Sequence, residues 1–175
     1  IINGDLKYNF GRFTYQEWKK VREFLGLIRD GTNVSVVKGN PDVILKKAVE
    51  KQQLTLEDHK VVDDIYITHG DTIPDDEAFQ EANTVIIGHV HPAISIGDGV
   101  RSEKYECFLK AEYEDKTLLC TPSFNDLSDG VDLLKDKINT PFLTESTSLD
   151  AEVFIHQDND VYDFGTVDSI RQRAS

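Results

Sequence analysis

Methionine is absent from this sequence of 175 residues, which begins with Ile1 and contains only two cysteines. Because translation starts at methionine, we expect the sequence to be an N-terminally incomplete part of a protein. Cys107 and Cys120 show neither a metal-binding nor a redox spacing. We therefore expect both to be small buried residues in a reducing, cytoplasmic compartment rather than a disulfide.

Long apolar runs and basic surface are also missing. No apolar run approaches the roughly 20 residues that a membrane-spanning helix needs. Lys and Arg number 19 and Asp and Glu 32, which gives a formal net charge of -13. A protein that binds long nucleic acids non-specifically usually carries a basic stripe, and no such stripe is visible in the sequence. We expect neither membrane insertion nor stable non-specific nucleic-acid binding, although bound divalent ions could still supply positive charge for phosphate chemistry.

The first half of the chain predicts helices that alternate with strands within a single domain, residues 1–175. Apolar residues recur at spacings of three and four in residues 14–29, which predicts an amphipathic helix with Thr14 as N-cap and Trp18 in the core. Shorter helices are predicted in residues 41–51 and 74–82. Residues 53–68 predict two antiparallel strands, with His59 in or near their turn; we interpret His59 as a surface histidine rather than a ligand.

The second half predicts short strands in residues 93–97, 104–113, 116–124, 151–157 and 161–167. Asp158 and Asn159 form the turn of the last hairpin. His156 lies in that hairpin, and we interpret it as an exposed strand residue.

The motif TVIIGHVHP, residues 84–92, joins a buried strand to two histidines. Residues i and i+2 of an extended chain point to the same side, so we expect His89 and His91 to lie about 6.6 Å apart at Cα. At that spacing each imidazole could hold one of two neighbouring metal ions. A single motif of this kind is weak, because one histidine of such a pair is often only a hydrogen-bonded polar residue.

Three upstream segments repeat this arrangement, since each is an apolar strand that ends beside a glycine and a metal-competent side chain. These side chains are Asp5, Asn40 and His69. In a parallel α/β sheet the carboxyl ends of the strands lie along one edge, where the side chains can converge. Oxygen and imidazole ligands without thiolate suit Mn, Fe, Co or Zn as a catalytic rather than a structural ion.

Four segments follow one another along the chain, GDLKY, GNPD, THGD and GHVHP. In their sequence and their order they resemble the signature blocks of the calcineurin-like metallophosphoesterase superfamily. Downstream segments such as ECFLK, TPSFNDLSDGVDLL and YDFGTV are similar to its archaeal phosphoesterase branch, which is related to repair nucleases. The resemblance covers nearly the whole chain. It implies an α/β fold, an αββα sandwich of two mixed sheets flanked by helices.

The resemblance also implies a site for two divalent metal ions, with Mn preferred over Fe, Co or Zn. Asp5 would bridge the metals, Asn40, His69 and His89 would complete one metal site, and His91 would belong to the other. A hydroxide held between the metals would attack phosphorus in line and hydrolyse a phosphodiester or nucleotide phosphate bond. Asp5, Asn40 and His69 are accordingly the expected catalytic residues.

Three departures from the family pattern bear on this expectation. The family's opening Asp-x-His block is missing. Pro41 stands where the family has the histidine thought to assist the leaving group, and Tyr8 stands where this branch commonly has histidine. Lys7 and Tyr8 are the candidate substrate-binding residues, and either of them or a metal-bound water could replace the missing proton donor. Activated aryl phosphodiesters need less acid assistance, so we expect them to be better substrates than DNA or RNA.

Two functional hypotheses follow. The first is a dinuclear, metal-dependent phosphoesterase acting on a phosphoester substrate such as a nucleotide or nucleic acid. The alternative is a catalytically reduced member that retains the fold as a binding or regulatory module, motivated by Pro41. Coincidental histidines in a purely structural domain are disfavoured by the four ordered blocks. The sequence defines neither a subunit interface nor an oligomeric state.

Overall fold

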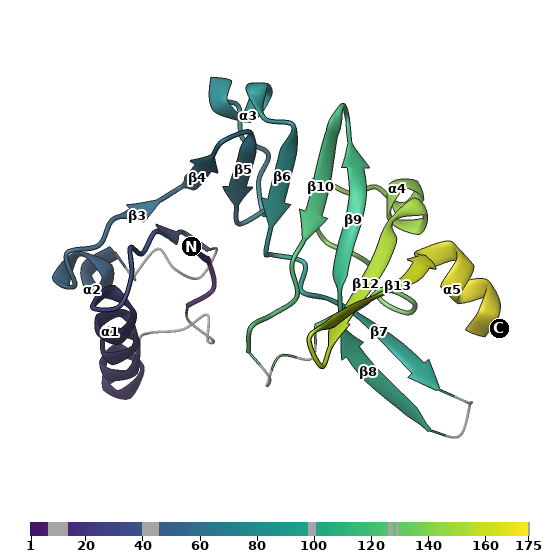
Figure 1. Ribbon diagram of the computed structural model, residues 1–175, viewed down its shortest axis with the longest axis horizontal. Helices are drawn as coiled ribbons and strands as arrows, with labels where there is room; N and C mark the ends of the chain where they lie inside the picture. Colours follow the sequence, from purple (N-terminus) through teal and green to yellow (C-terminus); the bar gives the residue numbers. More distant parts are fainter. Residues whose placement is uncertain (7–13, 40–45, 98–100, 126–127, 129, 175) are drawn as a thin grey trace.

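The computed structural model describes residues 1–6, 14–39, 46–97, 101–125, 128 and 130–174. In this part of the chain, helices flank three sheets of a mixed α/β fold (Figure 1). The mixed α/β class predicted from the sequence is confirmed, and the third sheet is an addition to the two expected.

A seven-stranded mixed sheet forms the centre of the molecule, with the strand order β13-β12-β9-β10-β6-β5-β4. β5, β6 and β10 run parallel to one another, so their carboxyl ends share one edge of the sheet. β4 and β9 run antiparallel to their neighbours β5 and β10, so the β4–β5 and β9–β10 turns lie at the opposite edge. The strands are β4 (His59–Val62), β5 (Ile65–Thr68), β6 (Thr84–Ile87), β9 (Phe108–Tyr113), β10 (Lys116–Cys120), β12 (Glu152–Gln157) and β13 (Asp160–Thr166).

Two three-stranded sheets complete the strands of the described residues. β1 (Ile2–Asn3), β2 (Val36–Val37) and β3 (Leu56–Glu57) are all parallel. β7 (Pro92–Gly97) pairs in parallel with β11 (Val131–Asp132) and antiparallel with β8 (Ser102–Glu106). Of the four strands expected to carry ligands, two therefore belong to the small parallel sheet and two to the large sheet.

The helices lie on the outside of these sheets (Figure 1). They are α1 (Tyr15–Arg29), α2 (Lys46–Lys51), α3 (Glu77–Glu81), α4 (Glu145–Asp150) and α5 (Val167–Ala174). The predicted start of α1 is confirmed by a capping box, in which Glu17 N donates to Thr14 Oγ1 and Thr14 N donates to Glu17 Oε2. Trp18 is half-buried and packs on the core cluster that includes Leu25 and Val36, as expected.

Strand β6 is less buried than its sequence predicts. Val85 and Ile87 are completely buried, whereas Thr84 and Ile86 on the other face are only half-buried.

The two cysteines are free and buried, as expected. Burial raises the pKa of each thiol to about 12.

The predicted pairing within residues 53–68 is wrong in its boundaries. Residues 56–57 pair in parallel with β2, and the hairpin consists of β4 and β5 with its turn at residues 63–64. His59 therefore opens β4 opposite Thr68 and does not lie in the turn. Local alternation cannot reveal that a distant strand, β2, is the partner of the first segment.

The single strand predicted for residues 104–113 is also wrong, because the chain divides it between two sheets at Cys107. Cys107 N donates to Pro92 O, so β8 stays with β7 while β9 turns to pair with β10 and β12. The last hairpin is as predicted: Asp158 and Asn159 form its turn with positive φ, and His156 is exposed.

Candidate functional site

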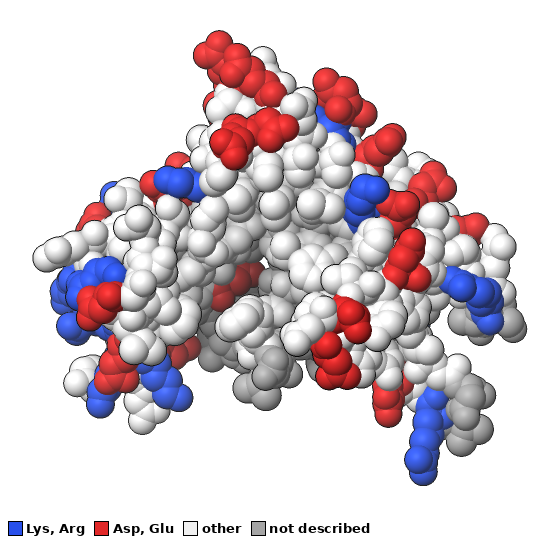
Figure 2. Space-filling view, in the orientation of Figure 1, with Lys and Arg blue, Asp and Glu red and all other residues white. Residues whose placement is uncertain are grey.

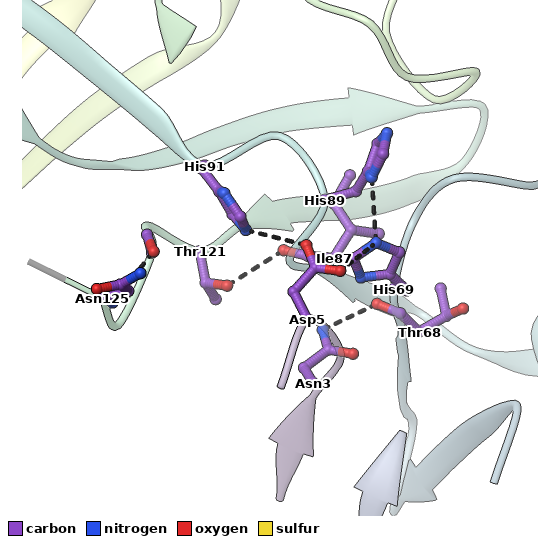
Figure 3. A network of polar contacts seen from close by, with 10 residues as sticks. Asn3, Asp5, Thr68, His69, Ile87, His89, His91, Thr121 and Asn125 are labelled. Carbon is purple, nitrogen blue, oxygen red and sulfur yellow. Dashed lines mark hydrogen bonds and ion pairs between the residues drawn. The ribbon is translucent and has the colours of Figure 1, made fainter. Parts of the chain in front are cut away.

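The ends of strands from two different sheets meet at one point (Figure 3). β1 ends at Asn3, β5 at Thr68 and β6 at Ile87. Asn3 Nδ2 donates to Thr68 O at 2.8 Å and so ties the small parallel sheet to the carboxyl edge of the large one. The polar residues that follow these strands are thereby brought together, as the pattern of strand, glycine and polar residue predicts.

Two glycines permit this close approach. Gly4 has φ +77°, and a Cβ there would lie 2.5 Å from His69 Nδ1 and 2.9 Å from Gly39 Cα. A Cβ on Gly88 would lie 3.0 Å from Asn3 O. Larger residues at these positions would separate the end of β1 from the ends of β5 and β6.

Asp5 lies between two histidines, with one carboxylate oxygen toward each (Figure 3). Its Oδ1 is 3.5 Å from His69 Nε2 and its Oδ2 is 3.6 Å from His91 Nε2. Asp5 itself has φ 52°, a left-handed conformation that Asp and Asn tolerate better than most residues.

His89 and His91 approach the site from a turn and not from an extended chain. His89 and Val90 lie in the turn and His91 has φ 47°, so the extended backbone expected for this pair is wrong. His89 Nδ1 instead lies 3.1 Å from His69 Nε2, and the two rings meet edge to face. The backbone of this turn is fixed by His69 O, which accepts hydrogen bonds of 2.9 Å from Gly88 N and His89 N.

The electrostatics keep two of these imidazoles uncharged at neutral pH. Burial lowers the pKa of His69, an effect that Asp5 opposes and His89 reinforces. Burial likewise lowers the pKa of His91 against the opposing influence of Asp5. A neutral imidazole has the free lone pair that a metal ion needs.

The types of donor present here, a carboxylate and imidazoles, suit a divalent cation. Asp5 Oδ1 and His69 Nδ1 are buried and have no hydrogen-bond partner, which is costly unless something else contacts them. A carboxylate with flanking imidazoles is the ligand chemistry of Mn, Fe, Co and Zn sites. Within the described residues, no three His, Cys, Asp or Glu side chains are gathered closely enough to hold one metal ion.

Three predicted site residues cannot be placed beside this cluster. Asn40, Lys7 and Tyr8 lie outside the described residues, as does Pro41. Their predicted roles as metal ligand and substrate contacts stay predictions.

Sequence reasoning missed three residues of this region. Asn3 joins the two sheets, and Thr121 supports β6 through hydrogen bonds from its N and Oγ1 to Ile87 O. His59 lines a cavity of about 760 Å³ beside His69, together with Tyr66 and Asp71. Asn3 could have been found, because it ends an apolar strand beside a glycine as Asp5 and His69 do. Thr121 and His59 have no such sequence pattern. They reach this region only because β10 pairs with β6 and β4 pairs with β5.

Comparison with known proteins identifies no family: no family model and no curated protein matches the chain. Among solved structures the chain is similar to vacuolar protein sorting 29 from Cryptosporidium parvum, with 15% identity and a TM-score of 0.40, covering 94% of this chain and 96% of that one. At this level of similarity the comparison supports no conclusion about the family or the function of this chain. None of the helices in the described ranges is long and apolar enough to cross a membrane.

Proposed function

We propose that the protein is a metal-dependent phosphoesterase that hydrolyses phosphodiester or nucleotide phosphate bonds. The observation that supports this proposal is the position of Asp5, whose two carboxylate oxygens lie toward His69 and His91 on opposite sides. One of these oxygens is buried without a hydrogen-bond partner. A carboxylate in this position would be available to two cations, one beside each histidine.

The chain's residues would divide the metal site as follows. Asp5 would be shared, His69, His89 and Asn40 would hold one ion, and His91 would hold the other, with Mn the preferred metal. When bound, two such ions neutralise phosphoryl oxygens and make water a nucleophile at neutral pH.

The remaining contacts would position the substrate and the site. Lys7 and Tyr8 would contact the phosphoryl group. Gly4 and Asn3 would keep the end of β1 against His69, so that the metal ligands from the two sheets stay close together.

The acidic character of the chain favours a nucleotide or another small phosphoester over a long polyanion. We further propose a cytoplasmic setting, in keeping with two free, buried cysteines.

The first experiment is a Mn²⁺ titration of the full-length protein with turnover of bis(p-nitrophenyl) phosphate. Asp5→Asn removes a negative charge but keeps a side chain that tolerates positive φ. We expect this variant to lose turnover by about 100-fold or more, since even outer-shell residues of metal sites commonly contribute 10- to 100-fold. Asp160→Asn, on the exposed start of β13, is the matched control and should retain activity. Mn-independent turnover, or an Asp5→Asn variant as active as the wild type, would contradict the proposal.

A catalytically reduced binding module is the second candidate, and the sequence feature that favours it is Pro41 in place of a proton-donating side chain. Calorimetry distinguishes the two functions: Mn²⁺ binding that Asp5→Asn abolishes, without turnover of any aryl ester, would favour the binding module.

A further inference from the structure

The cavity of about 760 Å³ shares His69 with the candidate metal site. His69 contacts Asp5 and His89 on one side and also lines the cavity. The remaining wall comes from the end of β2, from β4 and β5, and from the loop that precedes α3, with Lys38, His59, Tyr66 and Asp76 among its residues. A phosphoester held beside His69 would therefore have room for one of its substituents in this cavity.

His59 is held firmly on the cavity wall. Its backbone pairs with Thr68, the residue before His69. Its ring stacks on Tyr66, with centroids 4.5 Å apart and an interplanar angle of 23°. Tyr66 is itself buried, and its hydroxyl donates to Asp76 Oδ2 at 2.6 Å. Asp76 is fixed in turn as the N-cap of α3, where it accepts from Phe79 N.

The two nitrogens of this ring have different surroundings. Nδ1 lies 3.8 Å from Asp76 Oδ2, within salt-bridge distance when the ring is protonated. The structure shows no hydrogen bond to Nε2 from any described residue. The other charged groups on this wall belong to two pairs and a loop. Asp58 pairs with Lys38 Nζ at 2.9 Å, and Glu57 pairs with Lys60 Nζ at 3.5 Å. Asp71 and Asp75 lie in the loop before α3. Nε2 is thus the nitrogen that can contact a ligand in the cavity.

Hydrolysis of an ordinary phosphoester has a proton requirement that the metal ligands cannot meet. As water oxygen bonds to phosphorus, the P–O bond to the departing alcohol breaks and leaves its electron pair on that oxygen. A proton must reach this oxygen unless the alcohol is unusually acidic, and a positioned acid contributes about 10²- to 10⁴-fold to the rate. Histidine gains and loses a proton between about pH 5 and 8, which suits this role.

We propose that the cavity receives the leaving group and that His59 is the general acid. Its Nε2–H proton passes to the departing oxygen, which leaves as the neutral alcohol, and the ring is reprotonated from solvent. This assignment rests on the proposed phosphoesterase function. It gives a catalytic role to a residue that the sequence pattern indicates only as a surface histidine.

The test compares two esters of similar shape, diphenyl phosphate and bis(p-nitrophenyl) phosphate, in Mn-loaded full-length protein. We expect His59→Asn and His59→Gln to lower kcat for diphenyl phosphate by about 100-fold or more. Both variants should retain turnover of bis(p-nitrophenyl) phosphate within about threefold, because p-nitrophenolate leaves without a proton. His156→Asn, at an exposed position near the end of β12, is the control histidine and should change neither rate.

Two results would overturn the assignment and are distinguishable. Equal losses on both esters, in variants that unfold at the wild-type urea concentration, would show that His59 does not act on the leaving group. Absence of Mn-dependent turnover of either ester by the wild type would contradict the phosphoesterase function itself, and the role of His59 would fall with it.

Discussion

Gly4 shows how strongly one position controls the site. Its positive φ and its closeness to His69 and Gly39 leave no room for a side chain. Gly4→Ala should lower the free energy of unfolding by about 2–4 kcal/mol, from left-handed backbone strain and overpacking together. It should also weaken Mn²⁺ binding, because Asp5 follows directly and would move away from His69.

Urea unfolding and calorimetric Mn²⁺ titration measure the two effects of this change. Gly31→Ala is the matched control, since a Cβ there would meet only Ile28 O at an ordinary 3.7 Å. Unaltered stability and Mn²⁺ affinity in Gly4→Ala would show that the strand ends do not need this close approach.

Single residues also mark the limit of what the sequence could predict about the site. Asp5, His69, His89 and His91 were predictable, because each follows an apolar strand beside a glycine, and the structure brings these four together. The backbone conformation of His91 was not predictable, since its left-handed φ departs from the extended chain expected for this motif.

At the scale of elements, Lys116 at the start of β10 stabilises a helix distant in sequence. Its side chain is buried, and Nζ donates to Gln80 O and Ala82 O at the carboxyl end of α3. A cation at this end of a helix satisfies carbonyls that have no partner within the helix. Lys116→Met should therefore lower the free energy of unfolding by about 2–3 kcal/mol.

Lys110→Met is the control for this change, because Lys110 is exposed on β9 and pairs with the partly exposed Glu152. Removing an exposed pair should cost less than about 1 kcal/mol. Equal urea midpoints for the two variants would contradict the capping role of Lys116.

The sequence predicted where helices and strands occur better than it predicted which strands pair with each other. The start of α1 follows from Thr14 and Glu17, which are local signals. The separation of β8 from β9 at Cys107, and the pairing of β3 with β2, depend on strands far away in the sequence. Alternation of apolar residues indicates a strand but not the edge against which it pairs.

For the whole molecule, charge predicts which substrates can approach. Figure 2 shows acidic side chains gathered over the end of the molecule where α3 lies, with Lys and Arg scattered elsewhere on this face. Because these 175 residues carry a net charge of -13, this chain should bind a 30-base-pair DNA more weakly than about 10⁻⁴ M at physiological salt, the weak limit of ordinary non-specific binding.

Fluorescence anisotropy with and without Mn²⁺ tests this expectation. A salt-dependent dissociation constant in the micromolar range without metal would contradict it, and would show that the protein carries its own surface for nucleic acid.

The site and two of the hairpin turns lie at opposite ends of the strands of the large sheet, which has a practical consequence. The site lies where β5 and β6 end, whereas the β4–β5 turn at residues 63–64 and the β9–β10 turn at residues 114–115 lie on the opposite side of the same sheet. Both turns contain a residue with positive φ and are built from acidic side chains. A peptide tag or reporter domain can therefore be inserted at either turn, and immobilisation through it would leave the site open to the solution.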